Sequence, residues 1–286
     1  MDDGYGGGGL ARNRGCGRLL IALVIAAVGV IAYMSRTEVN PVTGEKQHVA
    51  LSVDQEKVLG LEAAPEMAQK MGGDVPAGDP RARMVEEVGG RVVAKSNAAT
   101  SPYAGNFHFH LLADPQTVNA FALPGGQIFI TEGLYDRLQT EAELAGVLGH
   151  EVGHVINRHS AEQMAKGQLG QTLSQAVGVA ASDGSDGGQR AAMIAAMVNQ
   201  MVQLRYGRQD ESESDRYGID AMADAGFDPK AMLAVMQILK QASGGQTPPE
   251  WLSSHPLPET RIVEIQEYLK SRRADSGAVS EGRPLR

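Results

Sequence analysis

The spacing of apolar residues along the chain predicts four amphipathic helices. Ser52, with Gln55 three residues later, fits the N-terminal cap of a helix that runs to about Met71. Asp79 followed by Pro80 fits the cap and first position of a second helix. The apolar residues of this second helix recur at helical intervals: Met84, Val85, Val88, Val92 and Val93.

The third predicted helix is apolar around much of its circumference. Thr140 and Glu143 fit a capping box at its start, and we expect the helix to continue past His159. A wide apolar stripe follows the cap: Ala142, Leu144, Ala145, Val147, Leu148 and Val152. This pattern predicts a buried helix. The fourth helix is expected from Glu259 to about Arg272.

Alternating residues and turn signals predict three short strands. In residues 106–112, His108 and His110 lie on one face and three apolar residues lie on the other: Phe107, Phe109 and Leu111. A solvent-facing sheet edge is the favoured interpretation of the two histidines, and a metal site is the alternative. Residues 118–123 and 127–130 are separated by a Pro-Gly-Gly turn, which predicts a hairpin.

These elements together predict an α+β fold, in which a mostly helical body carries a small mixed sheet. The folded domain is expected to span residues 52–272. The flanking segments are expected to be a disordered glycine-rich start, an apolar run, a polar linker and a polar C-terminal tail: 1–18, 19–36, 37–51 and 273–286.

Residues 19–34 form an apolar run without charge, bracketed by Arg18 and Arg36. At 1.5 Å per residue this run spans about 24 Å, slightly less than the ~30 Å hydrocarbon layer of a bilayer. Arginines precede the run, so a single membrane anchor would leave the domain outside the cytoplasm. The alternative is a signal peptide cleaved near Ala32, which exports the same domain.

Composition narrows the classes of function. The chain has 286 residues, a formal net charge of -8 and an isoelectric point near 5.4, so it lacks the basic footprint of a nucleic-acid partner. Its single cysteine, Cys16, excludes an internal disulfide and a zinc site made of thiolates.

The candidate chemistry lies in the third predicted helix, where residues 150–154 read His-Glu-Val-Gly-His. His150 and His154 are four residues apart, so both imidazoles can converge on one metal ion. Glu151 can reach a water at that ion without ligating it. A catalytic zinc has three protein ligands and one open position, so a third ligand must come from elsewhere. His159 is turned off the ligand face and is interpreted as structural or as a neighbour of the ligands.

An acidic stretch further along supplies candidates for the third ligand. Glu211 and Asp215 are four residues apart, on one helical face. One carboxylate can ligate zinc while the other accepts the N–H of a ligating histidine. Glu213 points elsewhere on such a helix, although spacing alone does not exclude it.

Residues 167–205 contain two alanine- and methionine-rich stretches around a turn at 183–188. Met193, Met197 and Met201 form one helical stripe. Core packing is the favoured interpretation of this stripe, and a mobile lid over a cleft is the alternative.

Four motifs in order give the chain a resemblance to a known family: residues 119–126, 141–159, 211–218 and 255–259. Over roughly residues 40 to 270 the chain resembles gluzincin metallopeptidase family forty-eight. This is the group of the CAAX prenyl proteases, HtpX and periplasmic BepA. Two departures are visible, because the chain has one apolar run rather than several and stops before a helical repeat domain of the BepA kind.

The resemblance implies a zincin-type domain that binds one Zn²⁺ through three residues: His150, His154 and Glu211. It also implies that Asp215 orients a ligand and that Glu151 is the catalytic base. The family's cleft-facing histidine and arginine correspond to His255 and Arg261. His255 is expected to donate to the developing oxyanion or, by analogy with BepA, to occupy the fourth zinc position and hold the enzyme latent.

The expected function is a zinc-dependent endopeptidase that hydrolyses exported or membrane-associated proteins, with misfolded or misassembled envelope proteins as substrates. An edge strand is expected to hold the substrate extended through Gln127, Ile128, Phe129 and Ile130. The alternative function is a latent zinc protein with a chaperone or assembly role, in which His255 holds protease activity off.

Overall fold

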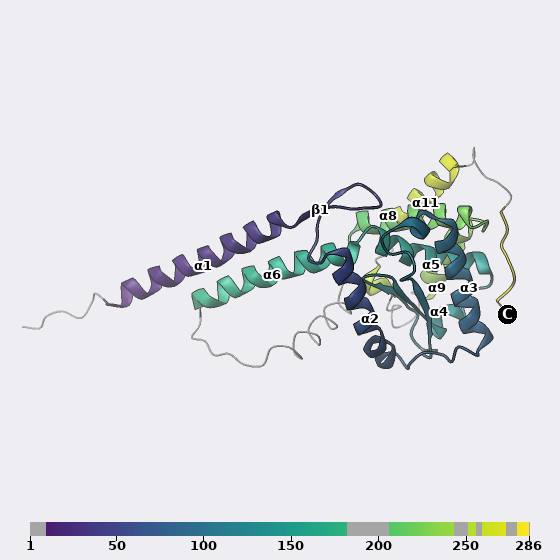
Figure 1. The fold of residues 1–286 in the computed structure, drawn as a ribbon, viewed down its shortest axis with the longest axis horizontal. Helices are drawn as coiled ribbons and strands as arrows, with labels where there is room; N and C mark the ends of the chain where they lie inside the picture. The colour runs from purple at the N-terminus through teal and green to yellow at the C-terminus, as the bar shows by residue number, and fades with distance from the viewer. Residues whose placement is uncertain (1–9, 182–205, 243–250, 256–258, 273–278, 286) are drawn as a thin grey trace, which may run out of the picture.

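The computed structural model describes residues 10–181, 206–242, 251–255, 259–272 and 279–285, and a helical body in it surrounds a small sheet. Two long helices, α1 and α6, lie side by side and project from this body (Figure 1). The helices are α1 (Leu10–Ser35), α2 (Val53–Lys70), α3 (Pro80–Lys95), η1 (Asn97–Thr100), α4 (Glu132–Tyr135), α5 (Glu141–Ile156), α6 (His159–Ala181), α8 (Arg208–Asp224), α9 (Ala231–Ala242), α10 (Trp251–Ser254) and α11 (Glu259–Arg272).

The predicted helix starts are confirmed by their caps. The hydroxyl of Ser52 accepts from the backbone N–H of Gln55, whose side chain accepts in return from the N–H of Ser52. Asp79 caps α3, with Pro80 as its first residue. Thr140 caps α5, but the carboxylate of Glu143 accepts from the N–H of Gln139 instead, so only half of the predicted capping box forms.

The sheet is small and mixed, as predicted, and its order is β3-β5-β4. The strands are β3 (His108–Leu112), β4 (Ala120–Leu123) and β5 (Gln127–Thr131). The predicted hairpin is formed by antiparallel β4 and β5, while β3 pairs parallel to β5. The expectation that 127–130 is an edge strand is therefore wrong. A hairpin leaves one side of each strand open, and β3 from earlier in the chain fills the open side of β5.

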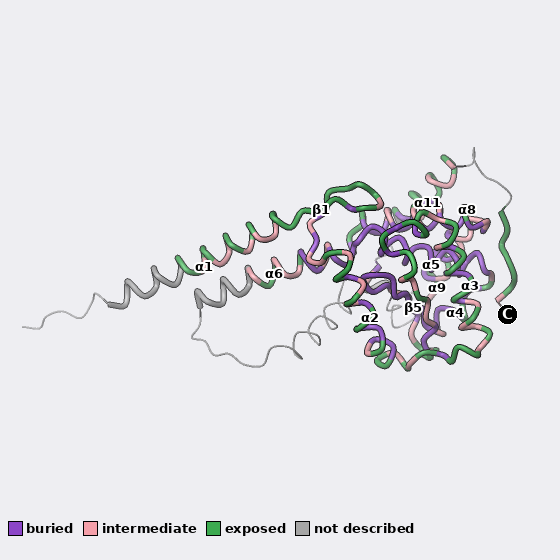
Figure 2. The backbone as a smooth tube through the Cα atoms, viewed as in Figure 1, coloured by how far each residue is buried: buried purple, intermediate pink, exposed green. Residues whose placement is uncertain are grey.

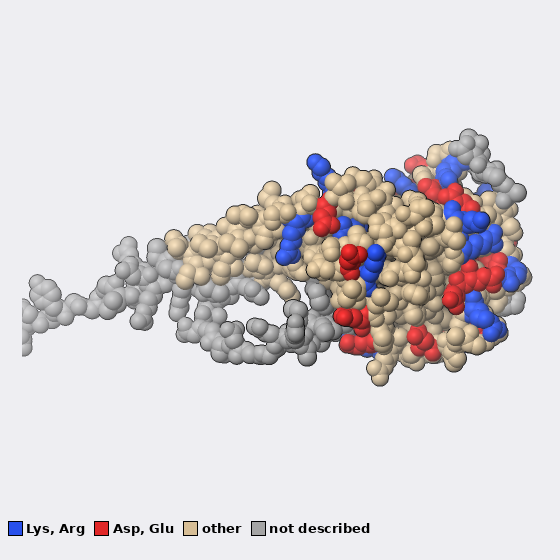
Figure 3. Space-filling view, viewed as in Figure 1, with Lys and Arg blue, Asp and Glu red and all other residues tan. Residues whose placement is uncertain are grey.

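The apolar run predicted as a membrane anchor lies inside α1, which begins at Leu10, within the segment expected to be disordered. In the part of the chain that the structure describes, no helix is both long enough and apolar enough to span a membrane. Along α1 the described side chains are mostly exposed (Figure 2), and the part of this helix that is not drawn grey in Figure 3 shows no Lys, Arg, Asp or Glu on the visible face. Close packing joins it to α6, since a Cβ at Gly29 would lie 2.7 Å from a methyl carbon of Thr172.

The segment predicted as a linker is folded onto the end of α5. It forms an antiparallel pair, β1 (Thr37–Val39) and β2 (Lys46–His48). The buried amide of Asn40 donates to the carbonyl of Ile156 at 2.9 Å, and the amide of Gln47 donates to the carbonyl of Asn157 at 2.6 Å. Both bonds satisfy carbonyls at the C-terminal end of α5, which a helix leaves without partners.

The segment predicted as a polar tail covers the opposite end of α5 with residues 279–285. The carbonyl of Arg283 accepts from the N–H of Glu141, and the carbonyl of Glu281 accepts from the N–H of Ala142. These are N–H groups of the first helical turn, which have no partner within the helix. The side chain of Arg283 also pairs with Glu141. Residues 273–278 lie outside the described part of the chain.

A break separates α5 from α6, so the prediction of one continuous helix past His159 is wrong. Arg158 has a φ of +58°, in the left-handed region, which ends the helix before it. Buried contacts hold this strained backbone in place. The guanidinium of Arg158 bonds three groups from the N-terminal part of the chain: the carboxylates of Glu56 and Glu38, and the carbonyl of Leu51.

Helices α5 and α8 cross at very short range because small residues meet there. A Cβ built on Gly153 would lie 2.9 Å from the Cα of Ser214. A Cβ built on Gly218 would lie 3.0 Å from the backbone nitrogen of His150. Every residue of α5 is buried, so this contact cannot relax toward solvent.

We predict that Gly218→Ala will lower the free energy of unfolding by about 1–3 kcal/mol, because the added methyl forces α8 away from α5. Urea denaturation of the full chain measures this change. Gly90→Ala in α3 is the control, since nothing lies within 4 Å of its added methyl. This control should gain roughly 0.5–1 kcal/mol from helix propensity. An equal response of the two variants would contradict the close-packing argument.

Candidate metal centre

Four buried side chains from three parts of the fold converge on one point. His150 and His154 come from α5, Glu211 comes from α8, and His255 directly follows α10. One ligand atom from each residue lies within 4.8 Å of all the others. The three residues predicted as metal ligands are thus brought together, and His255 joins them.

The spacing of these atoms fits a tetrahedral zinc site. Bonds of 2.0–2.1 Å to nitrogen or oxygen place tetrahedral ligand atoms about 3.3 Å apart. The Nε2 atoms of His150 and His154 are 3.1 Å apart, and Nε2 of His154 lies 3.5 Å from Oε1 of Glu211. Nδ1 of His255 lies 3.0 Å from the same oxygen. Nitrogen and carboxylate donors at these separations are a donor set that zinc prefers.

Asp215 and Arg261 bind the ligands from behind. Oδ1 of Asp215 lies 2.9 Å from Nδ1 of His150, on the ring side away from the ligand atoms. Arg261 in α11 donates to both oxygens of Asp215, at 2.7 and 2.8 Å, and lies 2.6 Å from Oε2 of Glu211. Burial alone would raise the pKa of Asp215, but Arg261 and His150 lower it to about 2.

These contacts change the predicted role of Arg261. The family resemblance implied that Arg261 faces the cleft. Its guanidinium instead forms a bidentate pair with Asp215 and contacts Glu211. An arginine held by two carboxylates orients the ligand shell.

Glu151 lies beside the ligands without joining them. Neither oxygen of its carboxylate has a hydrogen-bond partner among the described residues, and Oε1 lies 3.8 Å from Nε2 of His255. Burial raises the pKa of Glu151 to about 7 and that of Glu211 to about 7. Burial lowers the pKa of His255 to about 3. A carboxylate with free oxygens at this position can exchange a proton with a neighbouring water.

Two aromatic residues that the sequence analysis missed wall the ligand group. The ring of Tyr206 stacks on His154 at 4.0 Å between centroids, and its hydroxyl lies 3.0 Å from that of Ser160. Trp251 stacks on His255 at 4.7 Å. The one available signal was that the chain's single tryptophan stands four residues before His255.

The remaining histidines and Glu213 lie outside the ligand group. His159 contacts the far side of His154, with 2.9 Å between their Nδ1 atoms, and Glu213 pairs with His159. That hydrogen bond lowers the pKa of Glu213. On β3, His108 is exposed and His110 stacks on Phe129 at the sheet edge. The methionine stripe at 193–201 lies outside the described residues.

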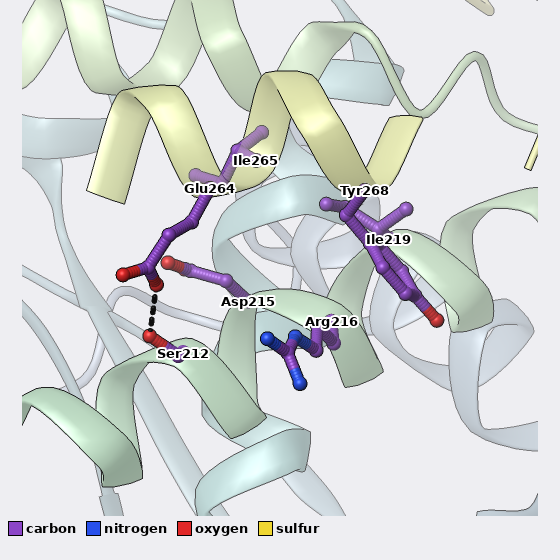
Figure 4. Close-up of a pocket in the computed structure, with 7 residues that line it drawn as sticks. All are labelled: Ser212, Asp215, Arg216, Ile219, Glu264, Ile265 and Tyr268. Carbon is purple, nitrogen blue, oxygen red and sulfur yellow. Dashed lines mark hydrogen bonds between the residues drawn. The ribbon is translucent and has the colours of Figure 1, made fainter. Parts of the chain in front are cut away.

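A pocket lies between α8 and α11 (Figure 4). Its lining residues are Ser212, Asp215, Arg216, Ile219, Glu264, Ile265 and Tyr268. Ser212 donates to Glu264 across it. Because Asp215 is the lining residue that contacts His150 and Arg261, the pocket lies behind the ligands and holds neither Glu151 nor His255.

The fold and the site define a class of protein. A buried helix presents two histidines four residues apart, a second helix supplies a carboxylate, and a free glutamate follows the first histidine. This is the arrangement of metal-dependent peptidases.

Comparison with known proteins identifies the family. Residues 79–269 match Peptidase family M48. The chain is 31% identical over 275 residues to the β-barrel assembly-enhancing protease of Escherichia coli (strain K12), covering 89% of this chain and 53% of that protein. It is 31% identical over 247 residues to the mitochondrial metalloendopeptidase OMA1 of Schizosaccharomyces pombe, covering 86% of this chain and 70% of that protein.

The chain belongs to Peptidase family M48, a family of metalloendopeptidases. A further relative, the putative β-barrel assembly-enhancing protease of Vibrio cholerae, is 32% identical over 260 residues, 88% of this chain and 52% of that protein. The chain spans about half the length of the bacterial relatives it matches.

We predict that Arg261→Met will destabilise the metal-free protein by about 3–5 kcal/mol, because two carboxylates lose their buried cation. Arg272→Met is the control, since its pair with Asp220 is partly exposed and should cost no more than about 1 kcal/mol. Urea denaturation in a chelating buffer compares the two. Equal losses would show that the buried pairs contribute no more than the surface pair.

Proposed function

We propose that the protein is a zinc-dependent endopeptidase whose zinc is held by His150, His154 and Glu211. The observation that carries the proposal is the tetrahedral spacing of the three ligand atoms beside the unpaired carboxylate of Glu151. Asp215 fixes the ring of His150 so that Nε2 faces the ligand group, and Arg261 fixes both carboxylates.

Peptide-bond hydrolysis then depends on proton transfer by Glu151. When bound, zinc supplies Lewis-acid polarisation of the scissile carbonyl and a lower pKa for the attacking water. Glu151 accepts the proton from that water and delivers it to the leaving amine. Neither oxygen of Glu151 has a hydrogen-bond partner among the described residues, so its carboxylate is available to take up that proton and to release it.

The sequence assigned substrate binding to residues 127–130, and we assign it instead to the neighbouring strand, β4. Residues 127–130 form β5, which has β3 on one side and β4 on the other, so they hold the sheet together. Within the described residues, β4 pairs with β5 alone and forms the sheet edge beside α5. An extended peptide that pairs with the outer side of β4 would gain main-chain hydrogen bonds and lie along α5, the helix that carries His150 and His154.

The names of the relatives suggest the biological setting. The bacterial relatives are called β-barrel assembly-enhancing proteases, and the yeast relative is called a mitochondrial metalloendopeptidase. We propose that this protein cleaves misfolded or misassembled proteins of the cell envelope. The charge pattern around residues 19–34 predicts a domain outside the cytoplasm, and that location stays a prediction.

We predict that Glu151→Gln will keep zinc bound and lower casein cleavage at least about 100-fold, because the general base is lost. Zinc content is measured beside the rate, with and without a chelator. Glu143→Gln, on the same helix, is the control and should keep full activity. Casein cleavage by purified Glu151→Gln at the parental rate would rule out Glu151 as the base.

A second proposal is that the zinc site is latent, and the position of His255 supports it. Nδ1 of His255 lies 3.0 Å from Glu211 and 3.4 Å from Nε2 of His150, within the ligand group. Four protein ligands would fill a tetrahedral zinc and leave no open position for water. In this proposal the protein acts chiefly as an assembly factor until His255 moves away. The other proposed role of His255 is to donate to the oxyanion.

The two roles of His255 predict opposite signs for His255→Ala. Removal of a fourth ligand opens a zinc position, so casein cleavage should rise. Removal of an oxyanion donor should lower cleavage about 100-fold or more. We expect a rise, because Nδ1 lies among the ligand atoms. The rate of casein cleavage per bound zinc decides between the two roles. A lower rate in His255→Ala than in the parent would exclude latency through His255.

A further inference from the structure

The break at Arg158 turns His159 onto a metal-ligating histidine. On a continuous helix a residue five positions after His154 would point about 140° away from it. The left-handed backbone of Arg158 ends α5 and starts α6 in a new direction. As a result, Nδ1 of His159 lies 2.9 Å from Nδ1 of His154, and both rings are buried.

One arrangement of protons satisfies the contacts of both rings. Nε2 of His154 faces the ligand group, 3.1 Å from Nε2 of His150, so it must be free of a proton to ligate a metal. Nδ1 of His154 then carries the proton and donates a hydrogen bond to Nδ1 of His159. Nε2 of His159 carries its own proton and donates to Oε2 of Glu213 at 3.1 Å.

The end of this chain of hydrogen bonds is itself held in place. The amide of Gln209 donates to Oε1 of Glu213 at 2.8 Å, which leaves Oε2 for His159. The hydroxyl of Ser214 lies 3.3 Å from Nδ1 of His159 and can add a second donor to that acceptor. Glu213 can only accept, so it fixes which nitrogen of His159 carries the proton.

The two ligating histidines thus have different supports. Asp215 contacts Nδ1 of His150 directly, whereas His154 contacts a neutral imidazole that is backed by a carboxylate. Partners of this kind set the tautomer and the ring orientation of metal-ligating histidines, and their removal typically weakens metal binding by about 10–100-fold.

We propose that His159 is a positioning residue of the metal centre, which accepts a hydrogen bond from His154 and is itself oriented by Glu213. This inference rests on the proposed function, because it assumes that His154 ligates zinc. It assigns a role to Glu213, the acid of the 211–215 stretch that the ligand group leaves out.

The test compares two replacements of His159 in the full chain. His159→Asn keeps an acceptor where Nδ1 lies, and His159→Phe keeps a ring without an acceptor. Zinc affinity is measured by competition with a chelating dye, and the unfolding of the metal-free protein is measured beside it. We expect His159→Phe to bind zinc about 10–100-fold more weakly and His159→Asn to bind within threefold of the parent.

A second pair of variants tests the same chain of bonds at its half-buried end. Glu213→Gln keeps an oxygen that accepts from His159, and Glu213→Ala removes it. We expect Glu213→Ala, but not Glu213→Gln, to weaken zinc binding. The same variant should change the visible spectrum of the Co²⁺-substituted protein, which reports ligand geometry. Glu66→Ala is the control and should change neither property, because this partly exposed acid of α2 pairs with Lys70 and not with a residue of the ligand group. If His159→Phe does not fold, the Glu213 pair decides.

The outcomes separate this inference from the proposed function. Parental zinc affinity in both His159→Phe and Glu213→Ala would overturn the positioning role and leave the zinc site standing. Equal weakening by His159→Asn and His159→Phe would also overturn it, because the acceptor would then be irrelevant. A parent protein that binds no zinc would overturn both proposals together.

Discussion

The close crossing of α5 and α8 is the constraint on which the site depends. Two of the grouped residues lie on α5 and the acidic residue lies on α8, and neither helix alone holds more than two ligand atoms. Where the helices meet, Gly149 and Gly153 of α5 lie against Gly218 and Ser214 of α8. Side chains larger than these would push the carboxylate of Glu211 out of reach of the imidazoles. Small residues at this contact therefore fix the distances between the ligand atoms.

The second requirement is electrostatic. Burial opposes the charge of every carboxylate around the ligand group, as the raised pKa values of Glu151 and Glu211 show. Arg261, which binds both carboxylates from a separate helix, outweighs burial at Asp215, whose pKa falls to about 2, and offsets it only in part at Glu211. Neither oxygen of Glu151 has a hydrogen-bond partner among the described residues. The fold thus stabilises the charges that hold the ligands and leaves one carboxylate unbound for proton transfer.

Both ends of α5 are held by segments that the sequence analysis predicted to be a linker and a tail. The β1–β2 pair satisfies carbonyls at the C-terminal end of α5, and residues 279–285 satisfy N–H groups at its start. Arg158 joins the first of these segments to the helix break through Glu38 and Leu51. A change in the N-terminal segment can therefore reach His159, and through it His154, without touching the ligand group.

The sequence by itself determined the local structure, because caps, turn residues and apolar periodicity act over a few positions. It fixed the start of α5 at Thr140, the β4–β5 hairpin, and two histidines on one helical face. Spacing alone left Glu211 and Glu213 both open as ligands, and only the crossing of α5 and α8 separated them. The central position of β5, the reversal at Arg158 and the walls formed by Tyr206 and Trp251 were also decided by tertiary contacts. Each of these depends on a residue far away in the chain, which no local pattern records.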